Sequence, residues 1–242
     1  MSDRKVVLIT GCAKGGIGYE YCKAFAEQNC NVFASDVPQR MSDLADLQHE
    51  QIETLELDVS SDESVAKAVD FVMSRCGKID ILINNAGIGS TGPLAELPLD
   101  VIRRAYEINA LGQLRMVQGV VPHMVARGGG SIVNIGSVVG KVPTPWAGSY
   151  CASKGLKDYD WRIYKNFKDA IAERARASQS GKSTDATVFA RHVASRVLSS
   201  SPPKTITSGH MTGLFNFLSW SPLWVRDLFF TKRLMKLNKM VV

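Results

Sequence analysis

The sequence predicts an α/β fold in which a doubly wound parallel β-sheet carries helices on both faces. Two observations indicate this fold: short aliphatic and β-branched runs alternate with longer amphipathic segments, and the first run leads directly into a glycine-rich turn. Strands separated by helices form right-handed βαβ units, which build a parallel sheet covered on both sides. A chain of 242 residues, 45% of them hydrophobic, can bury such a core.

The expected strands and helices alternate along the first 135 residues. Apolar runs of strand length lie at 5–10, 31–35, 52–57, 79–83 and 131–135. Apolar residues at helical spacing lie between them, at 18–28, 64–76 and 99–124. The glycines at 128–130 form a turn that leads into the fifth strand. Each strand but the last is thus followed by a connection that can return the chain for parallel pairing.

Charge and cysteine content narrow the classes of function. The net charge is +6, and the excess of basic residues lies after residue 155. These basic residues form no recognised nucleic-acid-reading element, so nucleic acid is not an expected partner. Five cysteines without C-x-x-C spacing, and charged residues close behind Met1, predict reduced thiols, no metal site and no signal peptide. We therefore expect a cytoplasmic protein, or one on the cytosolic face of a membrane.

The segment "TGCAKGGIG", Thr10–Gly18, lies where the first strand ends and the first helix begins. Glycines at such a point let the backbone approach a pyrophosphate, whose charge the helix N-terminus then stabilises. Asp36 follows the second strand, about twenty residues on, where a dinucleotide site uses a carboxylate to bind the ribose. The alternatives are an ordinary tight turn and a loop or capping role for Asp36.

Four further segments carry a family resemblance. They are "NNAG" at 84–87, "YEINALG" around Asn109, "NIGSVVG" at 134–140 and "YCASK" at 150–154. With the glycine-rich turn, they resemble the short-chain dehydrogenase/reductase family over residues 5–155. The resemblance implies a Rossmann-like fold and an NAD(P)-dependent transfer of hydride to or from a ketone.

The chemistry of ketone reduction explains a tyrosine and a lysine at this spacing. A proton must reach the developing alkoxide, and an ordinary tyrosine, with a pKa of about 10, is a poor donor at neutral pH. Lys154 follows Tyr150 by one helical turn, so its charge can lower the tyrosine pKa. The resemblance implies that Tyr150 is the general acid and base, and that Lys154 activates it and binds the nicotinamide ribose. It also implies that Ser137 donates a hydrogen bond to the substrate carbonyl and that Asn109 holds a water that relays protons. Taken alone, Tyr150 would be a half-buried structural aromatic.

The same resemblance assigns residues that bind the cofactor. The glycines taken as functional are Gly11, Gly16 and Gly18, because the turn has one residue more than the usual spacing. Ile17 would lie at the pyrophosphate, Asp58 and Val59 at the adenine, and Asn85 near the adenosine ribose. Asp36 favours NAD(H) by repelling a 2′-phosphate, whereas Lys14, and more weakly Arg40, could neutralise one and favour NADP(H).

After Lys154 the sequence departs from the family. No apolar sixth strand and no Pro-Gly turn follow; a charged amphipathic helix over 155–183 comes instead. We therefore expect an internal deletion after Lys154, a sheet without its sixth strand, and Pro203–Gly209 as a seventh-strand candidate. The predicted organisation is a catalytic domain over 1–209 and a tail over 210–242.

The predicted tail combines apolar and basic residues and is interrupted by glycine and proline, which favours a helical segment lying on an anionic membrane over a spanning helix. An exposed or dimer-forming tail, and hence a homo-oligomer, is the alternative. The tail, "YDWRIYKNF" and the glycine-rich turn resemble the acyl-dihydroxyacetone-phosphate reductase branch. That branch implies NADPH, a lipid ketone reduced to lysophosphatidate for phosphatidate synthesis, and the endoplasmic reticulum or lipid droplets. The alternatives are a catalytically impaired cofactor-binding isoform and a sterol or retinoid dehydrogenase.

Overall fold

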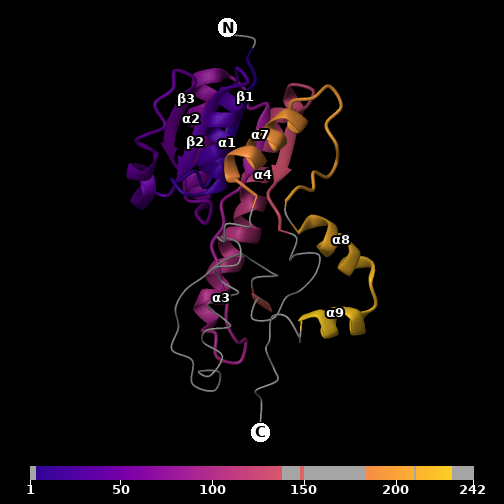
Figure 1. Cartoon of the computed structure of the whole chain (residues 1–242). Helices are drawn as coiled ribbons and strands as arrows, with labels where there is room; N and C mark the ends of the chain where they lie inside the picture. Colours follow the sequence, from indigo (N-terminus) through magenta and orange to yellow (C-terminus); the bar gives the residue numbers. More distant parts are fainter. Residues whose placement is uncertain (1–3, 138–147, 150–183, 210, 231–242) are drawn as a thin grey trace. The chain divides into compact units, whose positions relative to one another are not determined.

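The computed structural model describes residues 4–137, 148–149, 184–209 and 211–230, which include a five-stranded parallel β-sheet (Figure 1). The strands are β1 (Val6–Thr10), β2 (Asn31–Asp36), β3 (Ile52–Glu56), β4 (Ile81–Asn84) and β5 (Ser131–Asn134). Their order is β3-β2-β1-β4-β5, so the chain reverses its direction of winding beside β1. This order is that of a Rossmann-like fold, and it confirms the predicted doubly wound sheet.

The helices confirm most of the predicted pattern and correct one element. Those at predicted positions are α1 (Ile17–Ala26), α2 (Asp62–Cys76), α3 (Leu99–Tyr106) and α4 (Gly112–Ala126); η1 (Pro38–Leu44) is an additional 3-10 segment. The predicted helix over 99–124 is not continuous, because a π-helical turn, η2 (Glu107–Leu111), separates α3 from α4. Near the C-terminus lie α7 (Ala186–Val197), α8 (Thr212–Trp220) and α9 (Leu223–Phe230).

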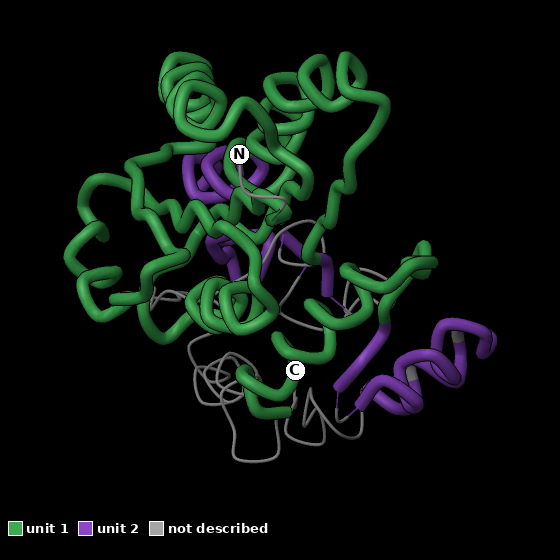
Figure 2. The backbone as a smooth tube through the Cα atoms, turned by 90° about the horizontal axis from the view of Figure 1, so that it is seen from above, with its two compact units in different colours: residues 1–86, 107–135, 184–206 green, residues 87–106, 136–183, 207–242 purple. Residues whose placement is uncertain are grey.

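The chain divides into two compact units, coloured separately in Figure 2. Unit 1 comprises residues 1–86, 107–135 and 184–206 and contains the sheet. Unit 2 comprises residues 87–106, 136–183 and 207–242. Its described helices are α3, α8 and α9.

The core of unit 1 lies on both faces of the sheet. Val7 and Ile9 of β1 belong to a buried cluster with residues of α1 and α7. Val6 and Leu8 belong to a second cluster, with residues of α2 and α4. Because successive side chains of a strand point to opposite faces, the two clusters show that each face carries its own pair of helices.

Helix α7 was not predicted from the sequence, although two signals for it are present. The side chain of Asp185 accepts hydrogen bonds from the backbone amides of Thr187 (2.9 Å) and Val188 (3.1 Å) and so caps its N-terminus. Its buried residues follow helical spacing: Ala190, Val193, Ala194 and Val197.

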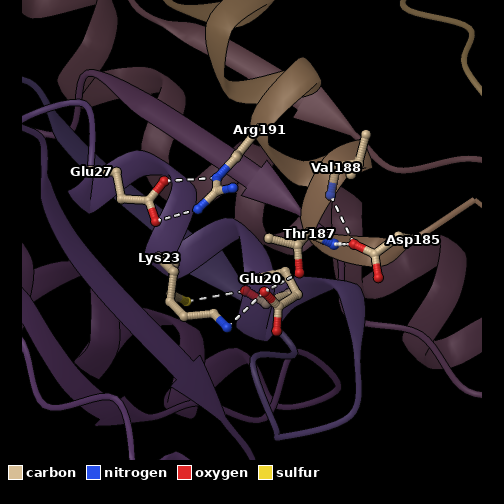
Figure 3. A network of polar contacts seen from close by, with 9 residues as sticks. Glu20, Lys23, Glu27, Asp185, Thr187, Val188 and Arg191 are labelled. Atoms are coloured by element: carbon tan, nitrogen blue, oxygen red, sulfur yellow. Dashed lines mark hydrogen bonds and ion pairs between the residues drawn. The ribbon is translucent and has the colours of Figure 1, made fainter.

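Polar contacts at the surface accompany the packing of α7 on α1 (Figure 3). The guanidinium of Arg191 donates two hydrogen bonds to the carboxylate of Glu27, at 3.0 and 2.9 Å. The hydroxyl of Thr187 donates to Glu20 (3.0 Å), which also pairs with Lys23 (2.7 Å). These contacts fix the helix over one face of the sheet, beside the helix that follows the glycine-rich turn.

Pro203–Gly209 forms no strand, so the seventh-strand prediction was wrong. A strand needs a neighbour with which to pair, and β5 is the last strand in the described sheet. Pro203 also lacks the amide that a ladder requires. The predicted helix over 155–183 lies outside the described residues.

No helix in the part of the chain that the structure describes has both the length and the apolar character needed to cross a bilayer. The apolar region after Thr205 instead forms the two short helices α8 and α9, which are separated at Ser221 and Pro222.

Candidate dinucleotide-binding and active site

The glycine-rich turn joins the carboxyl end of β1 to α1, and two of its glycines lie in close contact with backbone. Gly11 has a φ of +72°, and a Cβ added to it would lie 2.7 Å from the Cα of Ala86. A Cβ on Gly18 would lie 2.2 Å from the carbonyl oxygen of Gly11. No other residue fits at either position without moving backbone, so both glycines are structurally required.

The additional residue of this turn forms a small outward loop. The amide of Gly16 donates to the carbonyl of Ala13 (3.1 Å), which closes a four-residue turn with Gly15 in third position. Gly15 has a φ of +88°, the conformation that a type II turn requires there, and no atom lies within 4 Å of its Cβ direction. The inserted glycine therefore extends the loop, and the assignment of Gly11, Gly16 and Gly18 to the cofactor stays a prediction.

Thr10 and Asn85 hold the turn against the end of β4. The side-chain amide of Asn85 donates to the carbonyls of Thr10 (3.0 Å) and Gly11 (2.8 Å). The Thr10 hydroxyl accepts from the backbone amides of Asn85 (3.1 Å) and Ala86 (3.0 Å). Asn85 thus positions the loop. Thr10 was not assigned a role from the sequence, although it opens the motif.

Asp36, at the end of β2, is bound to the same loop. Its Oδ2 accepts a hydrogen bond from the amide of Ala13 (2.7 Å), and its Oδ1 accepts one from the amide of Val37 (2.8 Å). The residue is only 8% exposed. A carboxylate has further lone pairs, so Asp36 can still accept from a ribose hydroxyl while it holds the loop.

The two cations considered as partners of a 2′-phosphate are paired with carboxylates. Lys14 pairs with Asp46, and the neighbouring carboxylate raises the pKa of the lysine. Arg40 pairs with Asp43 at 2.7 Å. These pairs reduce the positive charge that Lys14 and Arg40 could offer to a 2′-phosphate.

Asp58 and Val59 lie between β3 and α2. The carboxylate of Asp58 accepts from the amide (2.9 Å) and hydroxyl (2.6 Å) of Ser60, so it shapes this turn. Val59 is buried, and a Cβ on Gly112 would lie 2.7 Å from its Cγ2. Gly112 therefore allows α4 to approach the predicted adenine site closely.

Arg115 of α4 links this turn to the π-helical segment η2, an arrangement that sequence reasoning missed. Its guanidinium contacts Asp62 (2.5 Å), Glu107 and the carbonyl of Val59 (3.4 Å). Glu107 begins η2, which carries Asn109. One side chain therefore ties the predicted adenine site to the segment that presents the predicted relay residue.

The thiol nearest the glycine-rich turn is not a nucleophile. Cys12 is fully buried, and its sulfur lies 3.2 Å from the carbonyl of Ile9. Burial, with a smaller effect of the adjacent Cys22, raises the pKa of the Cys12 thiol. A protonated, inaccessible thiol at this point fills the core.

The structure describes two of the four predicted catalytic residues. Asn109 is half-buried in η2, and Ser137 is half-buried three residues after β5 ends. Tyr150 and Lys154 lie outside the described residues. Their neighbour Ser149 is buried, and its hydroxyl forms a 2.7 Å hydrogen bond with that of Ser90, on the chain that follows "NNAG".

The residues of unit 1 fit a dinucleotide. α1 begins at Gly16 without a side-chain cap, so its first amides are available to an anion. The glycine-rich turn, Asp36 and the Asp58 turn all follow carboxyl ends of neighbouring strands, on the side where α/β sheets bind their ligands. The fold and this site define a Rossmann-type dinucleotide-binding protein.

Comparison with known proteins identifies the family. The short chain dehydrogenase family model matches residues 5–157. Short-chain dehydrogenase ptmH of Penicillium ochrochloron is 28% identical over 264 aligned positions, which cover 93% of this chain and 96% of that protein. Human 17-beta-hydroxysteroid dehydrogenase type 1 is 36% identical over 169 positions, covering 62% of this chain and 48% of its own. The chain therefore belongs to the short-chain dehydrogenase/reductase family.

Solved structures agree with this assignment. A short-chain dehydrogenase from Streptomyces avermitilis shares the fold, with a TM-score of 0.80 at 21% identity over 96% of this chain and 98% of that one. A 3-ketoacyl-(acyl-carrier-protein) reductase from Brucella melitensis, solved with NADH, is 30% identical over 61% of this chain and 63% of its own, with a TM-score of 0.57. The protein is thus an NAD(P)-dependent oxidoreductase that acts on CH–OH groups.

Proposed function

We propose that this protein reduces a ketone on a lipid substrate, with NAD(P)H as the reductant. The observation that carries the proposal is the joined glycine-rich turn, Asp36 and Asn85 at the ends of β1, β2 and β4. In the sequence, Ser137 follows β5 by three residues and precedes Tyr150 and Lys154 at family spacing. The nicotinamide, when bound, supplies the hydride.

The chain's own residues would manage the proton. Ser137 would donate a hydrogen bond to the substrate carbonyl oxygen and so polarise the C=O bond. The Tyr150 hydroxyl would give its proton to that oxygen as negative charge develops there, and the ammonium of Lys154 would stabilise the resulting tyrosinate. Asn109 would hold the water from which Tyr150 regains its proton.

The proposed substrate is an acylated dihydroxyacetone phosphate, whose reduction gives a lysophosphatidate. The support is the resemblance of the glycine-rich turn and of the C-terminal sequence to that reductase branch, together with an apolar C-terminal region in unit 2. A sterol ketone is the second candidate. The specific observation in its favour is the similarity to a 17-beta-hydroxysteroid dehydrogenase over 62% of the chain.

We further propose that the chain lacks an internal segment after Lys154 and that its turnover is correspondingly low. The alignment with ptmH spans 264 positions, more than the 242 residues of this chain, so that relative has residues for which this chain has no counterpart. A misplaced nicotinamide can cost about a hundredfold in rate.

For the cofactor we propose that both NADH and NADPH bind with weak discrimination. Asp36 disfavours a 2′-phosphate, whereas the branch resemblance favours NADPH, and the paired Lys14 contributes less to NADPH affinity than the sequence predicted.

The test is a substrate panel with the full-length chain. Purified protein would be incubated with NADH or NADPH and, in parallel, with a long-chain acyl dihydroxyacetone phosphate, a steroid ketone and a simple ketone. We expect the acyl ketone phosphate to be reduced fastest. A steroid ketone that is reduced faster would establish the second candidate, and reduction of neither lipid by the intact chain would contradict the lipid proposal.

A further inference from the structure

Helices α8 and α9 of unit 2 form a hairpin with a core of its own. Phe215 and Leu218 of α8 are buried against Phe230 of α9. The hairpin nevertheless exposes large apolar side chains: Phe217 (65%), Trp220 (91%), Trp224 (68%) and Leu228 (50%). We call these four residues the apolar face.

The spacing places these side chains together on each helix. Phe217 and Trp220 are three residues apart in α8, and Trp224 and Leu228 are four apart in α9, so each pair lies on one side of its helix. Trp220 directly precedes the turn at Ser221 and Pro222, and Trp224 follows it after Leu223. Two exposed tryptophans therefore flank the tip of the hairpin.

Polar backbone at this tip is satisfied from within the hairpin. The carbonyl of Leu218 accepts from the amide (3.2 Å) and hydroxyl (2.8 Å) of Ser221. The guanidinium of Arg226 donates to the carbonyls of Ser221 (2.9 and 3.1 Å) and Ser219 (3.5 Å). Carbonyls at a helix C-terminus normally accept hydrogen bonds from water. Because this hairpin supplies its own donors, the free-energy cost of removing water from these carbonyls in an apolar medium is smaller.

The charge of the sequence in and after the hairpin indicates which apolar medium it would enter. Residues 205–225 contain no Asp, Glu, Lys or Arg, whereas residues 226–242 contain five basic residues and one acidic residue. Tryptophan beside basic residues is typical of the interface of a membrane with anionic headgroups. α8 and α9, with 9 and 8 residues, are too short to span the hydrocarbon layer.

We infer that the apolar face inserts into the headgroup layer of an anionic bilayer, with the hairpin lying in the interface. The inference does not depend on the proposed reaction, because the described hairpin forms it without the catalytic residues. It deepens the proposed function, since a lipid ketone would be met at the surface where it is dissolved.

The test is flotation of the full chain with lipid vesicles, either of phosphatidylcholine alone or with added phosphatidylserine. We expect binding to the anionic vesicles, weakened by salt, and a blue shift of the tryptophan fluorescence. The double variant Trp220→Ser/Trp224→Ser should bind at least about tenfold more weakly. The matched control is Val125→Ser/Val188→Ser, which removes two exposed apolar side chains (70% and 61%) from α4 and α7 and should bind as the unaltered chain does.

Three outcomes would overturn the inference. They are failure of the unaltered chain to float with anionic vesicles, equal loss of binding in the control variant, and unchanged binding of the tryptophan double variant. A dimer that the tryptophan substitutions dissociate, seen by light scattering without vesicle binding, would instead assign the apolar face to a second copy of the chain. Substrate turnover is not part of this readout, so its loss would leave the inference standing.

Discussion

Asp36 has two effects that act on different parts of a bound cofactor. Its carboxylate accepts from the amide of Ala13 and thereby supports the glycine-rich turn. Its charge also lies where the ribose of a dinucleotide is expected, and there it disfavours a 2′-phosphate. A substitution therefore changes the affinity for both cofactors through the turn, but the ratio between them only through the charge.

We expect Asp36→Ala to shift the ratio of NADPH to NADH affinity toward NADPH by about tenfold to a hundredfold. This corresponds to about 1 to 3 kcal/mol for the removal of one like charge beside a phosphate. Fluorescence titration of both cofactors gives the ratio directly. Asp70→Ala, at an exposed position of α2, is the control and should leave the ratio unchanged; an unchanged ratio in Asp36→Ala would show that Asp36 does not face the ribose.

Arg115 is the second residue with a specific expectation. Arg115→Met leaves Glu107 and Asp62 without their shared cation and frees η2 from the turn at Val59. We expect cofactor affinity to fall about fivefold to tenfold, with partial recovery in Arg115→Lys, while the melting temperature changes little. Arg75→Met, which removes the exposed pair with Glu53, is the matched control. Equal affinity in Arg115→Met and Arg75→Met would contradict the link.

The strands and helices differ in how well their bounds could be predicted from the sequence. The strands were predicted to within two residues at either end, because each is an apolar run bounded by turn residues. The long helix over 99–124 was predicted without its π-helical turn η2, because the spacing of apolar residues does not reveal such a turn. α7 could have been predicted from its Asp185 cap and the helical spacing of its apolar residues, but its packing on α1 could not. Pro203–Gly209 was misassigned because β-branched composition cannot show whether a neighbouring strand exists.

The site was predictable to a similar degree. The spacing of the glycines and the placement of Asp36 and Asn85 at strand ends follow from the chain alone, and all three now lie in one hydrogen-bonded assembly. The pairing of Lys14 with Asp46 was not predictable, because the two residues are brought together only by the loop after β2.

At the opposite end of the sheet, Asp80 joins β4 to two neighbouring strands. It accepts from the amide of Val6 (2.7 Å) and pairs with Lys78 (3.1 Å) and Arg127 (3.2 Å). Burial acts to raise the pKa of its carboxyl, but the hydrogen bonds from Val6, Lys78 and Arg127 outweigh burial, and the net pKa is lowered. A group of this kind stabilises the fold above its unfolded pKa, and this stabilisation is lost as the pH falls toward its folded pKa.

We therefore expect Asp80→Asn to lower the free energy of unfolding by about 1 to 2 kcal/mol at neutral pH. The difference from the unaltered chain should shrink as the pH falls below about 4, the ordinary pKa at which the carboxyl of the unfolded chain takes up a proton, and vanish below the lowered pKa of the folded chain. Urea titrations across this range would measure it, with Asp70→Asn as the control. A difference that stays constant with pH would exclude the carboxylate as its cause.

At the scale of the whole molecule, the described cofactor-binding residues lie in unit 1, and we have proposed that the chain lacks a segment after Lys154. Unit 1 buries apolar residues on both faces of its five strands. On this proposal the adenosine end of a dinucleotide would be bound by unit 1, while the orientation of its nicotinamide would depend on residues that follow Ser137.

Grafting the missing segment onto this chain tests whether binding of the adenosine end and orientation of the nicotinamide depend on different parts of the protein. Insertion after Lys154 of the strand and Pro-Gly turn of a longer relative should raise turnover at least about tenfold while it leaves the affinity for the adenosine end nearly unchanged. The affinity would be measured with adenosine diphosphate ribose, which lacks the nicotinamide. If the unaltered chain already turns over as fast as the graft, no segment needed for catalysis is absent.

The most direct test of the central claim, that this chain is a reductase acting through Tyr150, is a single-turnover reaction with deuterium-labelled cofactor. Full-length protein, in excess over NADPH or NADH deuterated at the nicotinamide C4 position, would be incubated with the acyl ketone phosphate, and the alcohol examined by mass spectrometry. Even a slow enzyme should place one deuterium on the former carbonyl carbon, while Tyr150→Phe binds the cofactor normally and yields no labelled alcohol. Labelled alcohol in equal amount from Tyr150→Phe, or none from the unaltered chain with its cofactor bound, would contradict the claim.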